Sequence, residues 1–145
     1  MSKNASFKEQ VRRNLVALIS LAVAVTSLGY NTWRNEASEH NRNQRLVSIE
    51  VLLLLGDLQQ LTMDRHYGKN IDADAVLRKA WAKVLTIRDI AQVAEGGVPD
   101  AAENLYKTWN EDYDLLGSNV AAKDRVLNSL EGVRSATHDV LRSLD

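Results

Sequence analysis

The chain opens with an uncharged apolar run, and its later apolar residues recur with a helical period. Leu15 to Tyr30 reads LVALISLAVAVTSLGY and carries no charge. At about 1.5 Å per residue, a helix of this length spans roughly 24 Å, and extension to Trp33 brings it close to a ~30 Å hydrocarbon core. The run therefore predicts a transmembrane helix over residues 15–33.

The residues flanking the run suit two membrane interfaces. Tyr30 and Trp33 lie at one end, where amphipathic rings are favoured. Three arginines can extend toward the headgroups from the two ends: Arg12, Arg13 and Arg34. More basic residues precede the run than follow it closely, which favours a cytoplasmic N-terminus and an external C-terminal part.

Two other interpretations of the run stay open. Ser27-Leu28-Gly29 offers the small residues of a signal-peptide cleavage site, and a basic start precedes it. Gly29 is its only turn-forming residue and helical character continues beyond it, which favours an uncleaved anchor. A buried helix of a soluble protein is the third interpretation. The basic flanks and the end-placed aromatic residues argue against it.

Residues 34–45 are polar on every side and contain neither Gly nor Pro. Glu36 and His40, like Glu39 and Asn43, stand four positions apart, which suits a helix. We predict a helical stalk that continues the membrane span. A disordered linker is the alternative, because Asn residues lower helix propensity.

From Leu46 onward, apolar residues mark four helical faces separated by glycine-containing breaks. The predicted inward residues are Val47, Val51, Leu54, Leu58 and Leu61; then Leu77, Trp81, Val84, Arg88 and Ala91; then Ala102, Leu105, Trp109, Tyr113 and Leu116; and finally Val126, Leu130, Val133, Thr137, Val140 and Leu144. The unbroken apolar run 51–55 predicts burial on more than one side. The first helix is expected to extend from about Lys8 to His66 without a break.

Local signals predict where these helices begin and pack. Asn70 or Asp72 can cap the second helix, and Gly96-Gly97 is expected to end it. After Pro99, the spacing of Asp100 and Glu103 resembles a capping box for the third helix. Gly132 lies inside the fourth helix, where it suggests close packing.

These patterns predict an all-α chain, since no run shows the alternation of a strand. The expected architecture is an N-terminal transmembrane helix continuing into a long helix that packs in a small antiparallel, four-helix-like bundle. The predicted parts are a basic tail over residues 1–14, the transmembrane helix over 15–33, the stalk over 34–45 and an acidic bundle over 46–145.

Composition and charge narrow the function classes. The 145 residues include no Cys, which excludes disulfide scaffolds and thiolate metal sites. The formal net charge is −1, so a generally basic nucleic-acid binder is not expected. Residues 1–45 carry seven Lys or Arg and three Glu, whereas residues 46–145 carry eleven basic and sixteen acidic residues. A basic apolar end joined to an acidic body fits a membrane-proximal end and a soluble head.

Residue types that could support catalysis are sparse. None of the three His residues follows a Glu by three positions, as a di-iron bundle site requires. His66 and His138 could meet if the first and last helices are neighbours, although two exposed histidines are the simpler expectation. Residues 110–114 (NEDYD) lack the spacing of a calcium loop and are expected on a solvated helix face. We expect neither an enzyme nor a cofactor or metal site.

Four aromatic residues at helical spacing could line a small ligand pocket or fill a core: Trp81, Tyr106, Trp109 and Tyr113. Aromatic residues at such spacing more often belong to a core, and the pocket is the competing hypothesis.

One face of the first helix carries a candidate oligomer seam. Steps of three and four residues connect small residues in the apolar run, polar residues in the stalk and leucines in the head: Ala17, Ser20, Ala24, Ser27, Asn31, Arg34, Ser38, Asn41, Arg45, Ser48, Leu52 and Leu55. Small residues let membrane helices approach closely, and polar seam residues can set the register of an oligomer. The alternative is that small residues are simply common in membrane helices.

The segment from Ser27 to Arg45, in which an apolar span passes into NTWRNE, resembles the start of uncharacterised bacterial single-pass membrane proteins whose juxtamembrane helix is rich in Asn, Trp, Arg and Glu. That resemblance covers residues 27–45 and implies no activity. The layout of a span plus a bundle is also similar to the four-helix sensory modules of chemoreceptors. Those modules return through a second membrane helix, for which this sequence shows no apolar run before Asp145.

We therefore expect a non-enzymatic, single-pass protein of the bacterial inner membrane, with a periplasmic bundle. Its expected partners are the lipid bilayer, further copies of itself and a larger membrane complex, which it would serve as an assembly or accessory subunit. A ligand-sensing bundle is the alternative function.

Overall fold

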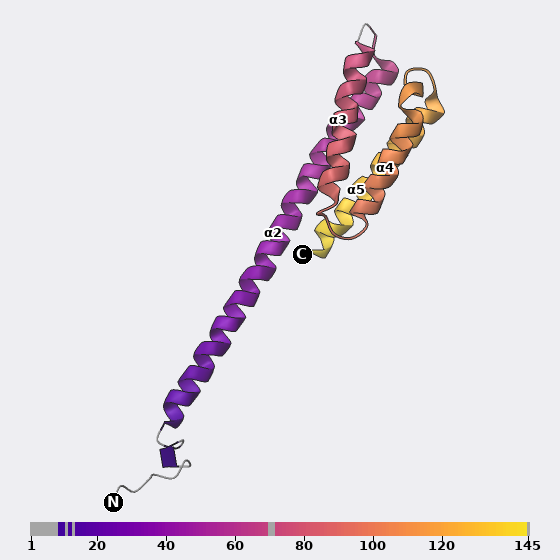
Figure 1. Ribbon diagram of the computed structural model, residues 1–145. Helices are drawn as coiled ribbons and strands as arrows, with labels where there is room; N and C mark the ends of the chain where they lie inside the picture. Colours follow the sequence, from indigo (N-terminus) through magenta and orange to yellow (C-terminus); the bar gives the residue numbers. More distant parts are fainter. Residues whose placement is uncertain (1–8, 11, 13, 70–71, 145) are drawn as a thin grey trace, which may run out of the picture. The chain divides into compact units, whose positions relative to one another are not determined.

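The computed structural model describes residues 9–10, 12, 14–69 and 72–144, and within them the chain is all-helical, without strands. The elements in chain order are α2 (Leu15–Tyr67), α3 (Ala73–Ala91), α4 (Val98–Asp112), a short 3-10 helix η1 (Tyr113–Leu115) and α5 (Val120–Ser143). Figure 1 labels the four α-helices. The predicted all-α class is confirmed.

Contacts divide the chain into two compact units, residues 1–40 and residues 41–145, and we call the second unit the head. The boundary falls inside α2, which is helical throughout residues 34–45, as predicted for the stalk. The expected unbroken start near Lys8 lies partly outside the described residues. Asn14 forms a turn, so the prediction of one continuous helix through this position is wrong.

The head begins at Asn41 by its contacts, whereas the sequence suggested Leu46. Gln44 explains the difference, because it is only 7% exposed and joins the loop that follows α3. Its Nε2 donates to the carbonyl oxygen of Val93 at 3.1 Å, and its Oε1 accepts from the backbone N–H of Glu95 at 3.1 Å. One buried amide thus ties the beginning of the head to the turn between α3 and α4.

Side-chain caps define the starts of α3 and α5, and the cap of α3 by Asp72 was expected. Oδ1 of Asp72 accepts from the backbone N–H of Ala75 at 2.9 Å, and Oδ1 of Asn119 accepts from that of Ala122 at 3.1 Å. The capping box predicted for α4 is wrong. Gly97 stands at the N-cap without a side-chain bond, and Glu103 instead pairs with Arg88 of α3.

The turn between α3 and α4 depends on Gly96. Its φ of +64° lies in the left-handed region that glycine tolerates best. A Cβ at this position would also lie 3.2 Å from Cγ2 of Val140 on α5. Helix α3 ends at Ala91, ahead of the predicted stop at Gly96-Gly97, and 3-10-type backbone bonds from residues 92–94 lead into this turn.

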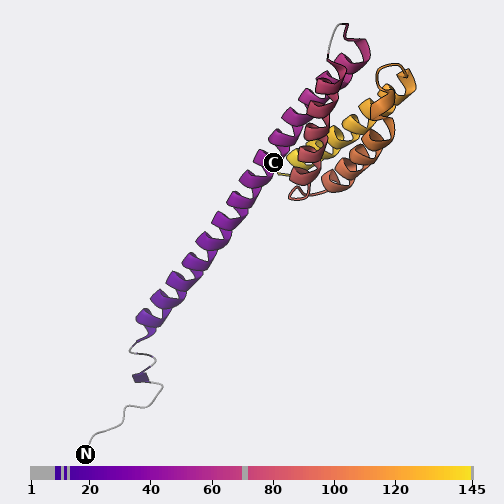
Figure 2. The ribbon, with the colours of Figure 1, turned by 45° about the horizontal axis from the view of Figure 1, so that its top comes forward.

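Within the head, α2 and α3 form one helical hairpin and α4 and α5 form another beside it (Figure 2). A single hydrophobic core draws residues from all four helices, and its largest fully buried members are Trp109, Leu55, Leu58, Ile87, Leu105, Leu116 and Leu130. Burying one apolar face in a shared core is what stabilises amphipathic helices of this length.

The predicted inward faces are confirmed best for α5, where Val126, Leu130, Val133, Thr137 and Val140 are all buried. On α3 the face is rotated: Ala80 and Ile87 are buried in addition to Val84 and Ala91, whereas Leu77, Trp81 and Arg88 are only half-buried. The predicted close packing at Gly132 is wrong, because a Cβ there would have no neighbour within 4 Å.

Candidate functional site

The N-terminal part of α2 exposes an apolar surface that no other described residue covers. From Leu15 to Leu28 its large hydrophobic side chains are 48–77% exposed. By length and composition, α2 is the one described helix that could cross a membrane. An uncovered apolar surface of this size needs lipid or protein around it, since water solvates it poorly.

The predicted interface residues occupy exposed positions at the two ends of this segment. Tyr30 and Trp33 lie one turn apart on α2, with ring centroids separated by 6.1 Å, so both rings lie on the same side of the helix. Arg12 and Arg34 are helical and exposed. Arg13 lies outside the described residues.

The structure divides the predicted oligomer seam between the two units. Seven of its residues and both seam arginines are exposed: Ala17, Ser20, Ala24, Ser27, Asn31, Ser38, Asn41, Arg34 and Arg45. In the head, however, Ser48 is 1% exposed and Leu55 is completely buried in the core, while Leu52 is half-buried. The seam prediction is therefore wrong at Ser48 and Leu55, because these side chains face the other head helices.

A different face of α2 is left apolar and exposed in the head. Leu46, Ile49 and Leu53 are 59%, 51% and 63% exposed, although each is a large aliphatic residue. Leu53 belongs to the run 51–55 that was expected to be buried on more than one side, so that expectation is wrong at this residue. We call Leu46, Ile49 and Leu53 the outer stripe. The seven-residue spacing of Leu46 and Leu53 can be read from the sequence, but the sequence does not show which face of α2 the head core covers.

The four aromatic residues proposed for a pocket do lie together. Trp81 of α3 is central, with ring centroids 6.2 Å from Tyr106, 6.3 Å from Trp109 and 5.4 Å from Tyr113. All three contacts are edge-to-face, the geometry that aromatic rings prefer when they pack on one another. Nε1 of Trp109 is buried without a hydrogen-bond acceptor among the described residues.

Charged groups border this aromatic cluster. The guanidinium of Arg88 lies 4.2 Å from the ring centroid of Tyr106, and its Nε donates to Glu103 at 2.8 Å. The carboxylate of Asp114 raises the pKa of Tyr113 through its charge and a hydrogen bond. A groove of about 410 Å³ lies elsewhere in the head, between α2 and α3. It is lined by Asp57, Gln60, Leu61, Asp64, Lys79, Ala82 and Lys83.

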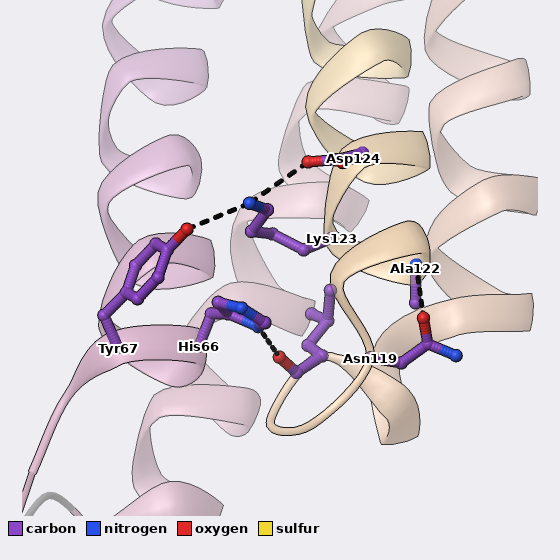
Figure 3. A network of polar contacts seen from close by, with 7 residues as sticks. His66, Tyr67, Asn119, Ala122, Lys123 and Asp124 are labelled. Carbon is purple, nitrogen blue, oxygen red and sulfur yellow. Dashed lines mark hydrogen bonds and ion pairs between the residues drawn. The ribbon is translucent and has the colours of Figure 1, made fainter.

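A polar network joins the end of α2 to the start of α5 (Figure 3). Nζ of Lys123 donates to Oη of Tyr67 at 3.0 Å and pairs with the carboxylate of Asp124 at 3.1 Å. The hydrogen bond to Tyr67 and then that to Asp124 raise the pKa of Lys123, although desolvation opposes the shift. Nδ1 of His66 donates to the carbonyl oxygen of Leu116 at 2.7 Å. Sequence patterns did not single out Lys123, whose side chain is only 9% exposed.

His66 and His138, which could have met if their helices were neighbours, lie near opposite ends of α5 and do not form a pair. His66 contacts the chain just before α5, whereas His138 lines a groove with Arg45 near the end of that helix. Among the described residues, no group of three potential His, Asp or Glu ligands could hold a metal ion.

The sequence suggested that the acidic segment over residues 110–114 lies on a solvated helix face, but one of its carboxylates is buried. Asp112 is 3% exposed, and both its carboxylate oxygens accept bonds from Arg125, at 2.8 Å from Nε and 2.5 Å from Nη2. A bidentate pair of this kind fixes the relative position of two helices, here α4 and α5. Asp112 therefore has a structural partner inside the head.

No protein-family model, curated protein or solved structure matches this chain.

Proposed function

We propose that this chain is a non-enzymatic, membrane-anchored subunit that acts by assembling with further copies of itself or with a larger membrane complex. The observation that carries the proposal is the apolar N-terminal part of α2, whose large side chains stay 48–77% exposed while the head encloses its own core. Lipid is the natural cover for an uncharged helical surface of this length. The exposed seam residues from Ala17 to Asn41 supply a face on which such helices can associate.

We further propose that the segment is an uncleaved single span in a bacterial inner membrane, with the N-terminus in the cytoplasm. The head is then a periplasmic, antiparallel four-helix bundle. The excess of basic residues before the span supports this orientation. The resemblance of residues 27–45 to bacterial single-pass proteins supports a single membrane span and a bacterial membrane.

Membrane insertion is tested by alkaline extraction of membranes that contain the full chain. We expect the chain to stay with the membrane, at its uncleaved mass. The double variant Leu21→Arg/Val25→Arg places two charges near the centre of the span, at a cost of about 2.5–3.5 kcal/mol each on insertion scales. It should move to the soluble fraction. A wild-type chain that is soluble or shortened would refute the anchor.

Orientation and assembly have separate tests. A cysteine introduced by Asn128→Cys, on an exposed position of α5, should react with a membrane-impermeant maleimide in intact cells whose outer membrane is opened. Native mass spectrometry of the extracted full chain should give a homo-oligomeric or heteromeric mass. A monomer without a bound protein would refute the assembly role.

A ligand-sensing head is the second candidate function, and the assembly of Trp81, Tyr106, Trp109 and Tyr113 into one cluster favours it. The buried Nε1 of Trp109 offers a hydrogen-bond donor to a ligand at that cluster. Tryptophan fluorescence of the full chain, titrated with a panel of small carboxylates and amines, tests this function. A flat response, equal to that of a Trp81→Phe variant, would argue against it.

A further inference from the structure

The outer stripe of the head is the strongest unpartnered feature among the described residues. Leu46, Ile49 and Leu53 follow one another at steps of three and four on α2, and they are 59%, 51% and 63% exposed. The other apolar face of the same helix is already used, since Val51, Leu54 and Leu58 lie in the core. Steps of three and four are the spacing of the contact positions in a two-stranded coiled coil.

We propose that the outer stripe binds the outer stripe of a second copy of this chain, with the two α2 helices parallel. This inference rests on the proposed membrane anchor, because copies anchored in one membrane with one orientation meet side by side and parallel. It corrects the predicted seam by moving the contact in the head from Ser48 and Leu55 to Leu46, Ile49 and Leu53.

Charge complementarity supports a second copy of this chain as the partner that binds the outer stripe. In a parallel pair, the residue just before one contact position lies beside the residue five positions later on the partner helix. For the outer stripe this places Arg45 of one copy beside Glu50 of the other, on both sides of the pair. Both residues are exposed. Arg45 also donates to the carbonyl oxygen of Leu144 at 2.9 Å, so a pair with Glu50 of a second copy would form in addition to this bond or in place of it.

The neighbouring positions define the extent of the contact. Gly56 takes the next contact position, and a Cβ there would meet nothing within 4 Å, so a partner helix can approach closely. In the other direction, Arg42 and Glu39 take the contact positions. Like charges would face each other there in a parallel pair, which limits the apolar contact to residues 46–56.

The seven-residue phase of the stripe also occurs in the apolar segment of the sequence, where it falls on Leu18, Leu21, Val25 and Leu28. Each of these residues directly follows a small residue of the predicted seam, so the two sets lie on adjoining faces of the helix. In a straight helix this phase rotates by about 20° per heptad, and paired helices remove the drift by winding into a left-handed supercoil. Three aliphatic side chains cover much less than the ~800 Å² per partner of a standard interface. The stripe therefore adds to an association that the membrane segment must also support.

Cysteine cross-linking in membranes tests the contact directly, because the chain has no Cys of its own. Full-length chains carrying Ile49→Cys or Leu53→Cys should form disulfide-linked dimers quickly on mild oxidation, since a disulfide requires Cβ atoms about 3.8 Å apart. The control is Asn128→Cys, an exposed position on α5, which should cross-link at least tenfold more slowly. Equal rates at all three positions would overturn the proposal.

A charge exchange tests the parallel register. Adding Glu50→Arg to the Leu53→Cys chain should slow cross-linking several-fold, and the further change Arg45→Glu should restore it. Failure to restore cross-linking, in chains whose circular dichroism shows an intact head, would overturn the parallel arrangement.

The outcomes separate this inference from the proposed function. A homo-oligomeric native mass without cross-linking at residues 49 and 53 would leave the assembly role standing and overturn the outer stripe as its contact. A heteromeric mass, with these two cysteines protected from maleimide, would assign the stripe to a different protein. A monomeric mass would refute both proposals.

Discussion

Leu53 and Leu55 provide a matched pair for testing which face of α2 is structural. Leu55 is completely buried in the head core, whereas Leu53 is 63% exposed. Leucine to alanine removes three carbon atoms, worth about 0.8 kcal/mol each when buried, and the cavity that remains adds to the loss. We expect Leu55→Ala to lower the free energy of unfolding by about 2–5 kcal/mol. Leu53→Ala should lower it by less than about 1 kcal/mol, because most of that side chain is already in water.

Thermal unfolding of the full chain in mild detergent, followed by tryptophan fluorescence and by circular dichroism, measures this difference. Trp81 and Trp109 belong to the head, so fluorescence reports its unfolding. A difference of 2 kcal/mol corresponds to a Tm gap of roughly 8 °C or more in a domain of about this size. Native mass spectrometry should show the reverse order, with Leu53→Ala reducing self-association more than Leu55→Ala does. Equal Tm values for the two variants would refute the assignment of core and surface on α2.

Three further predictions follow from local features of the head. Gly132→Ala should raise its stability by about 0.5–1 kcal/mol in urea unfolding, because Gly132 lies inside α5 with open space around its Cβ position; a loss of stability would show that this space is occupied. Gly96→Ala should lower stability by about 1–2 kcal/mol in the same assay, because the φ of +64° disfavours a side chain and the Cβ would crowd Val140; an unchanged midpoint would contradict it. The raised pKa of Lys123 implies a stabilisation that is complete at neutral pH and is lost only as the pH rises above about 10.5, through the raised pKa of the folded state. Lys123→Met should therefore flatten the alkaline part of the Tm profile, and an unchanged profile would exclude Lys123 as its origin.

The helices and most of their inward faces could be predicted from the sequence, because each depends on residues close together along the chain. Val126, Leu130, Val133 and Val140 recur at helical spacing, and their burial on α5 follows that spacing. Asp72 caps α3 as its residue type suggests. The apolar run from Leu15 is a helix for the same local reason, and its lack of charge makes it a candidate span without reference to any neighbour.

Polar partners could not be predicted in this way, because they join residues far apart in the sequence. Glu103 had the spacing of a capping residue but pairs with Arg88 of the preceding helix, and Asp112 was expected in solvent but binds Arg125. A buried carboxylate without such a partner would be costly, so its burial depends on where another helix places a cation.

The sequence by itself determined that this protein is helical, that its first apolar run can span a membrane and where most of its helices begin and end. The tertiary structure decided which side of α2 is core and which side is surface. Leu53 and Leu55 are chemically identical and two positions apart, so no local rule separates them. The shared core of the head encloses Leu55 and leaves Leu53 exposed, since a helix can turn only part of its circumference toward a core.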